Sequence, residues 1–226
     1  MKVGDFSDFQ KTELSLWVIV IVLLLILAYY FINRGIHKED IPKSFNIAAG
    51  IIFLGVGYMR ICSILYDYFD ILYENQIILF LGNIGVFLGA LPLVLYLEKN
   101  TYRRTKYLLS IVAIVFFSVF IFVSLASNFD KMVMGFWVLP PFAIELLILA
   151  GGYIYLIIKS SGTVRKSSLL ILIGVALLLG FWYIHGTYGP HGIPPIPIVA
   201  DYLAILSPLF IIIGTLIAAK GFFGYS

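Results

Sequence analysis

Seven long apolar runs dominate this sequence, and short polar stretches separate them. An α-helix rises 1.5 Å per residue, so about twenty apolar residues suffice to cross the hydrocarbon core of a bilayer. Backbone groups in lipid must bond within their own segment, which favours helices for such runs. We therefore expect an all-α polytopic membrane protein, a single seven-helix transmembrane domain over 1–226, with spans at about 15–33, 44–66, 77–97, 105–126, 134–158, 167–185 and 200–219.

The composition agrees with this class of protein. Hydrophobic residues make up 62% of the chain and charged residues 12%, whereas soluble domains carry about 25% charged residues. The net charge of +3 is small and the basic residues form no single block, so we expect no nucleic-acid partner. Cys62 is the only cysteine, which excludes an intramolecular disulfide and a multi-cysteine metal site.

The connections between the runs predict how the chain sits in the membrane. Most of the basic residues lie in alternate connections or after the last run: Arg34, Lys38, Lys43, Lys99, Arg103, Arg104, Lys106, Lys159, Arg165, Lys166 and Lys220. Positively charged loops stay in the cytoplasm. We therefore expect a multi-pass protein of the cell membrane with its N-terminus outside and its C-terminus in the cytoplasm.

Small residues and prolines within the runs predict close and kinked helix packing. Gly82, Gly85 and Gly89 share nearly one helical face, where small residues let helices approach closely in lipid. This face fits internal packing or, alternatively, a homo-oligomer. Prolines in or near the start of three runs (Pro92, Pro140, Pro141 and Pro208) can each kink a helix and widen the gaps beside it.

Ionisable groups inside the spans are the strongest pointers to function, because burying them in lipid is costly. Arg60 in the second run, Asn83 in the third and Glu145 in the fifth are expected at a similar depth in the outer half of the bundle. Two interpretations stay open: Arg60 and Glu145 form a structural ion pair, or they line a ligand pocket open to the outside. In the second interpretation the remaining lining residues are Asn83, Tyr58, Trp182, Tyr183 and His185.

Other chemistry finds no support in the sequence. His185 and His191 flank a Gly- and Pro-rich connection, but their spacing matches no metal-binding pattern. The catalytic motifs H-E-x-x-H, G-x-S-x-G and Walker A do not occur. We therefore expect no metal, no cofactor, no catalytic residues and no enzymatic activity.

The overall layout resembles the prokaryotic seven-transmembrane sensor modules that precede histidine kinases and cyclases. The resemblance covers the number of spans, the external N-terminus, the basic inner loops and the C-terminus at Ala219-Lys220-Gly221-Phe222, where an output domain would join. It implies a sensor or receptor-like module that binds a small ligand, lipid or ion from the outer side. Because no connection is long enough to fold as a domain, we expect it to signal through a cytoplasmic or membrane partner.

Two alternatives to a sensor remain. The chain also resembles small sugar transporters of three plus one plus three helices, which have a similar length and prolines at matching places in both halves. Pro92 and Pro208 match in the third and seventh runs, whereas Pro140 and Pro141 have no counterpart in the first. A small transporter or channel is therefore the second interpretation, and a structural subunit of a membrane complex is the third.

Overall fold

The computed structural model describes residues 8–37, 41–68, 76–102, 105–188 and 197–224, with only the backbone described at 9, 41, 42, 131, 179, 181–188 and 197–204. These residues form seven helices: α1 (Asp8–Ile36), α2 (Ile41–Tyr68), α4 (Gln76–Thr101), α5 (Leu108–Ala126), α6 (Lys131–Lys159), α7 (Gly162–Tyr188) and α8 (Pro197–Phe223). The all-helical prediction is confirmed, and each expected span falls on one helix.

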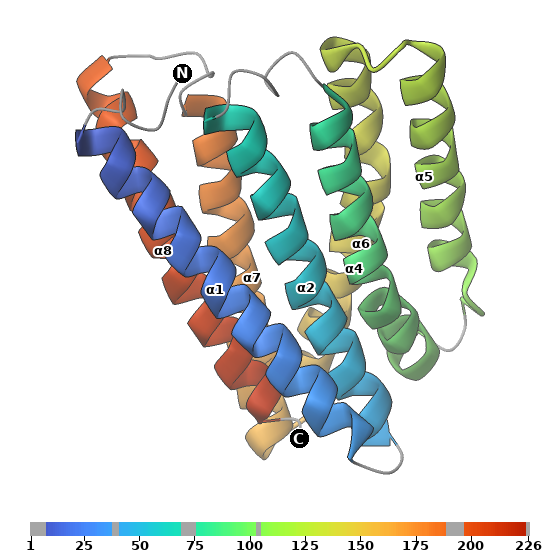
Figure 1. The fold of residues 1–226 in the computed structure, drawn as a ribbon. Helices are drawn as coiled ribbons and strands as arrows, with labels where there is room; N and C mark the ends of the chain where they lie inside the picture. The colour runs from blue at the N-terminus through green and yellow to red at the C-terminus, as the bar shows by residue number, and fades with distance from the viewer. Residues whose placement is uncertain (1–7, 38–40, 69–75, 103–104, 189–196, 225–226) are drawn as a thin grey trace.

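Successive helices run in opposite directions, which brings three connections and the end of α8 to one end of the bundle (Figure 1). We call this the basic end, because its exposed side chains include Lys43, Lys99, Lys106, Lys159, Arg165, Lys166 and Lys220. The fold thus gathers at one end most of the described basic residues on which the predicted orientation depends. Which end faces the cytoplasm stays a prediction.

Six of the seven described helices are long and apolar enough to cross a membrane, the exception being α7. The span expected at 167–185 lies within α7, whose side chains from 181 onward lie outside the described part. Large apolar side chains near the middle of the helices are exposed, among them Ile26, Val115 and Leu147, at 59%, 54% and 72%. A helical bundle with such a surface is an integral membrane protein in contact with the lipid bilayer.

The fourth span begins later than its apolar run suggests. Lys106 and Tyr107 have positive φ angles of 48° and 68°, so the chain turns there and α5 starts at Leu108. Left-handed backbone cannot continue a right-handed helix. The expected start at about 105 is therefore corrected by three residues.

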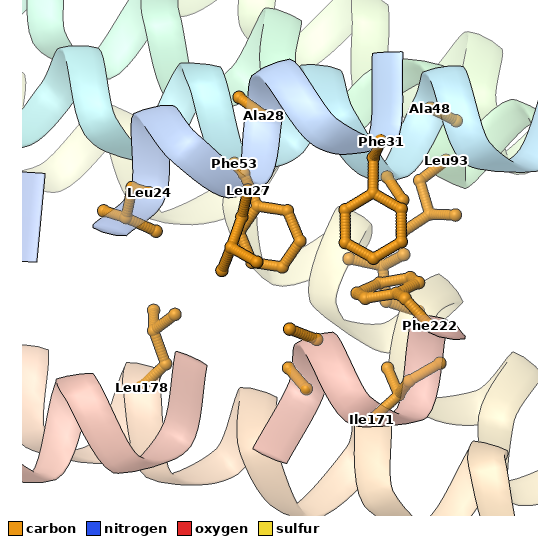
Figure 2. Packing of buried hydrophobic residues seen from close by; sticks show 14 of the residues in the cluster. Leu24, Leu27, Ala28, Phe31, Ala48, Phe53, Leu93, Ile171, Leu178 and Phe222 are labelled. Carbon is orange, nitrogen blue, oxygen red and sulfur yellow. The ribbon is translucent and has the colours of Figure 1, made fainter. Parts of the chain in front are cut away.

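The core consists of two apolar clusters. The large cluster joins α1, α2, α7 and α8 with the second halves of α4 and α6. Figure 2 shows part of it, with Phe31 of α1 close to Phe222 of α8, and Leu24 of α1 facing Leu178 of α7. The small cluster joins α5 with the first halves of α4 and α6, and its centre is a ring stack of Phe87 on Phe117 with centroids 3.7 Å apart. Helices α4 and α6 therefore pass from one cluster to the other along their length.

Glycines allow the tightest helix contacts. A Cβ on Gly89 of α4 would lie 2.9 Å from the Cα of Gly55 on α2, and a Cβ on Gly174 of α7 would lie 2.5 Å from the carbonyl oxygen of Gly214 on α8. Only glycine permits such a close approach of two backbones. Of the two interpretations of the Gly82-Gly85-Gly89 face, the structure shows the internal one, since all three glycines pack against α2.

Candidate functional site

Buried ionisable side chains occur at three places in the described part of the molecule. Glu13 and Arg60 lie together near the end opposite to the basic end, Glu98 lies near the basic end, and Glu145 lies at mid-height. Exposed fractions of 1% to 4% place all four within the protein rather than against lipid or water. Their partners decide what each can do.

Arg60 lies against α1. Its guanidinium carbon is 3.1 Å from the centroid of the Trp17 ring, a close cation–π contact. The Trp17 Nε1–H in turn donates to Oε1 of Glu13 over 3.3 Å. Glu13 is also hydrogen-bonded to Tyr68, and Arg60 interacts electrostatically with both Glu13 and Asp67. These residues form a buried charged cluster that ties the start of α1 to the end of α2.

The ion pair between Arg60 and Glu145, one of the two interpretations from the sequence, is not formed. The guanidinium of Arg60 faces Trp17, and neither carboxyl oxygen of Glu145 has a hydrogen-bond partner. The two side chains differ in depth and face different neighbouring helices. Arg60 lies eight residues, about 12 Å, from the end of α2, whereas Glu145 lies fourteen residues, about 21 Å, from the start of α6. Arg60 finds its acidic partners on α1 and on its own helix instead.

Glu98 of α4 caps the start of α5. Its carboxylate accepts hydrogen bonds from the backbone N–H groups of Leu109 and Ser110, at 3.0 and 2.9 Å, and from the hydroxyls of Thr105, at 2.6 Å, and Ser110. The first N–H groups of a helix have no partner within the helix, and negative charge is favoured there. This buried carboxylate is therefore fully engaged in holding the connection between α4 and α5.

Glu145 is the middle residue of α6, with fourteen residues on either side, so it lies about 21 Å from each end of the helix. The sequence placed it in the outer half because its apolar run starts at 134, whereas the helix starts at Lys131. Pro141, Ile148 and Gly152 share its helical face and are buried like it. Since a Cβ on Gly152 would lie 3.4 Å from Leu97, this face packs against α4.

Glu145 also lies where α6 passes between the two apolar clusters. Trp137 and Phe142 before it pack against the small cluster, Ile148 and Leu149 after it belong to the large cluster, and Ile144 contacts both. The carboxyl is 2% exposed, and neither of its oxygens has a hydrogen-bond partner. Among the described residues, no charged side chain interacts with it electrostatically.

Of the other residues of the expected pocket, neither Tyr58 nor Asn83 is hydrogen-bonded to Glu145. Tyr58 is 41% exposed and packs against Gly85 of α4, and Asn83 is half-buried on α4. The side chains of Trp182, Tyr183 and His185 lie outside the described part, so their place in a pocket stays a prediction.

Comparisons with known proteins add no further assignment. No protein-family model matches this chain, and neither curated proteins nor solved structures show a significant match to it. The chemistry of the buried groups must therefore carry the functional argument.

Two buried carboxyl groups were missed as site residues in the sequence. Glu13 lies before the apolar run at 15–33, although α1 begins at Asp8. Its spacing of four residues from Trp17 was the available signal, because such pairs meet on one helical face. Glu98 follows the run at 77–97 by one residue, and the nearby Thr105 and Ser110 were the signal for a cap.

Proposed function

We propose that this chain is a receptor-like membrane sensor whose input is a proton or another small cation bound at Glu145. Its output is a change in how α6 packs between the two apolar clusters. The resemblance in layout to seven-transmembrane sensor modules supports the same class. The observation that carries the proposal is the carboxyl group of Glu145, buried at mid-helix with both oxygens unbonded.

The physical argument starts from the cost of that burial. An ionised carboxylate without a partner is far more costly in a low-dielectric interior than a neutral carboxyl group. The tightly packed arrangement therefore suits the proton-bound form of Glu145. Loss of the proton favours any arrangement that gives the carboxylate water, a metal cation or a donor group.

Helix α6 has a place at which it can bend. Pro140 and Pro141 lie inside the helix, one turn before Glu145, and neither can donate a backbone hydrogen bond. The segment before them packs with α5, and the segment after Glu145 packs with the large cluster. Occupancy of Glu145 would thus shift the balance between two packings of the same helices.

The basic end is where we place the output. Helix α6 ends there at Lys159, followed by the exposed Arg165 and Lys166 at the start of α7. A movement of the second half of α6 changes the position of these charges. A membrane or cytoplasmic partner with an acidic surface could read that change.

The test measures a distance as a function of pH. Spin labels on Lys43→Cys and Lys159→Cys, in a Cys62→Ala background, report the separation of α2 and α6 at the basic end by pulsed electron resonance. We expect the distance distribution to change between about pH 5 and about pH 9. A carboxyl group in water loses its proton below this range, so a change within the range is the signature of a carboxyl group that is buried without a partner. Glu145→Gln should remove the change, because an amide stays neutral throughout.

Glu13→Gln is the matched control, since it alters another buried carboxyl group in the same bundle. It should keep the change with pH, because Glu13 lies in the separate cluster with Arg60 and Trp17. A response that survives Glu145→Gln, or is absent from the wild type, would contradict the sensor proposal.

A proton- or cation-coupled transporter is the second candidate, and the same carboxyl group favours it. Intramembrane carboxyl groups serve as proton relays in transporters, and prolines lie inside α4, α6 and α8. Proteoliposomes with an internal pH dye separate the two candidates. If the protein is a transporter, the dye reports a proton flux that Glu145→Gln abolishes. If it is a sensor, the spin-label distances change with pH but the dye reports no net proton flux.

A further inference from the structure

A groove of about 510 Å³ opens between α2 and α4 at the basic end. Its floor is apolar and consists of Ile47 and Ala48 from α2 with Pro92 and Leu95 from α4. This site is separate from Glu145, which lies on the contact between α6 and α4. The groove does not depend on the proposed function.

The groove follows from how α2 and α4 pack. The two helices touch most closely at Gly55 and Gly89, near the middle of the bundle. Pro92 follows Gly89 by three residues and cannot donate a backbone hydrogen bond to the carbonyl of Leu88. From this level to the basic end, the space between the two helices forms the groove.

The mouth of the groove differs chemically from its floor. Ser44, Lys99, Asn100 and Tyr107 line it, and all four are exposed at the basic end. The lining therefore changes from apolar at the level of Pro92 to polar and cationic at the end of α4. A phospholipid changes in the same way along its length, from an apolar acyl chain to a charged head group. A soluble metabolite has no long apolar part to match the floor.

The charge at the mouth selects among lipids. Lys99 lines the groove itself, while the exposed Lys43 and Lys106 are the chain neighbours of Ser44 and Tyr107. Glu98, the acidic neighbour of Lys99, is buried and occupied by its hydrogen bonds to α5. Glu98 and Lys99 form no salt bridge with each other, so the Lys99 ammonium group is available to a ligand, and basic pockets between membrane helices bind anionic head groups.

We propose that this groove holds one acyl chain of an anionic phospholipid from the leaflet at the basic end, with the lipid phosphate against Lys99. The hydroxyls of Ser44 and Tyr107 supply further donors at the mouth. Glu98 takes part indirectly: it fixes the connection in which Tyr107 has its positive φ, and so shapes one side of the mouth. The acyl chain fills the apolar floor and supports the α2–α4 contact below Gly89.

The experiment is native mass spectrometry of the purified protein with added dioleoyl phosphatidylglycerol or dioleoyl phosphatidylcholine. We expect one retained phosphatidylglycerol per chain and weaker retention of phosphatidylcholine. Lys99→Gln should lower the preference for phosphatidylglycerol about fivefold, which is the contribution of one lysine near an anionic lipid surface. Ser44→Trp should lower the retention of both lipids, because the indole covers the mouth.

Lys166→Gln is the matched control, since it removes an exposed lysine at the same end but outside the groove. It should leave the lipid preference unchanged. Equal effects of Lys99→Gln and Lys166→Gln would reduce the binding to general surface charge and overturn the proposal. So would full lipid retention in Ser44→Trp, or displacement of phosphatidylglycerol by free glycerol phosphate, which would show a head-group site without an acyl chain.

Discussion

The same substitution at two buried glutamates should have different effects on stability. Glu98 and Glu145 are 1% and 2% exposed, so burial does not distinguish them. Glu98 accepts hydrogen bonds from two backbone N–H groups and two hydroxyls, whereas neither oxygen of Glu145 accepts any. Replacement of each by glutamine and by methionine therefore separates a carboxyl group that stabilises the fold from one that does not.

The expected magnitudes follow from these hydrogen bonds. Glu98→Gln replaces one acceptor oxygen by an amide that faces N–H or O–H donors, and hydrogen bonds to charged groups contribute about 1.5–3 kcal/mol each. Each oxygen accepts one backbone N–H and one hydroxyl, and the hydroxyl can rotate to accept from the amide, so the net loss is one bond. We expect Glu98→Gln to lower the free energy of unfolding by about 2–3 kcal/mol, or the melting temperature by about 4–12 °C. Glu145→Gln should change stability by less than about 1 kcal/mol, because no bond is lost. Glu145→Met should raise it by about 1–3 kcal/mol, since an unsatisfied buried polar group is removed.

The assay can use the single cysteine of the chain. Cys62 is buried in α2, so a dye that becomes fluorescent on reaction with thiols reports unfolding during heating. All four variants and the wild type should be measured in one detergent at neutral pH. Two results together would refute the structural role of Glu98 and the proposed functional role of Glu145. These are a melting temperature of Glu145→Met at or below that of the wild type, and a melting temperature of Glu98→Gln equal to that of the wild type.

Further substitutions test the close helix packing and the charged cluster. Gly89→Val should lower the free energy of unfolding by about 1–3 kcal/mol through overpacking against the backbone of Gly55. Gly135→Ala is the control: nothing lies within 4 Å of the new Cβ, so the free energy of unfolding should stay unchanged or rise slightly. Thermal denaturation measures both variants. Arg60→Met should cost about 3–5 kcal/mol by leaving buried acidic groups without their cation. Adding Glu13→Gln to that variant should recover part of the loss in the same melt, and a purely additive loss would refute the charged cluster.

The positions of the described helices could be predicted because they depend on local properties. The length of an apolar run fixes whether a helix can cross the hydrocarbon core, and its flanking residues fix the end. The errors were at the boundaries, where α1 begins before its apolar run and α5 begins three residues later than expected. Polar residues continue a helix beyond the lipid, so hydropathy underestimates helix length.

The partners of the buried charges could not be predicted in the same way. Depth along the membrane normal follows from residue count, and it placed Arg60 and Glu145 near each other. Contact also requires that each helix is rotated about its own axis so that the two side chains face one another. This rotation depends on how all the helices pack. Arg60 turns towards Trp17 on α1, while Glu145 lies on the face of α6 that packs against α4. Pair assignments between distant helices therefore needed the fold.

The local sequence nevertheless distinguishes the two glutamates that the stability test compares. Glu98 is followed within twelve residues by Thr105 and Ser110, which supply its hydrogen bonds where the chain turns back at the membrane edge. Glu145 has no polar residue within one helical turn on either side, from Pro141 to Leu149. A buried carboxyl group in such a segment can be satisfied only by another helix, by water or by a ligand. Because no described residue of another helix supplies a partner, water or a bound cation is left to do so, and that is the basis of the role proposed for Glu145.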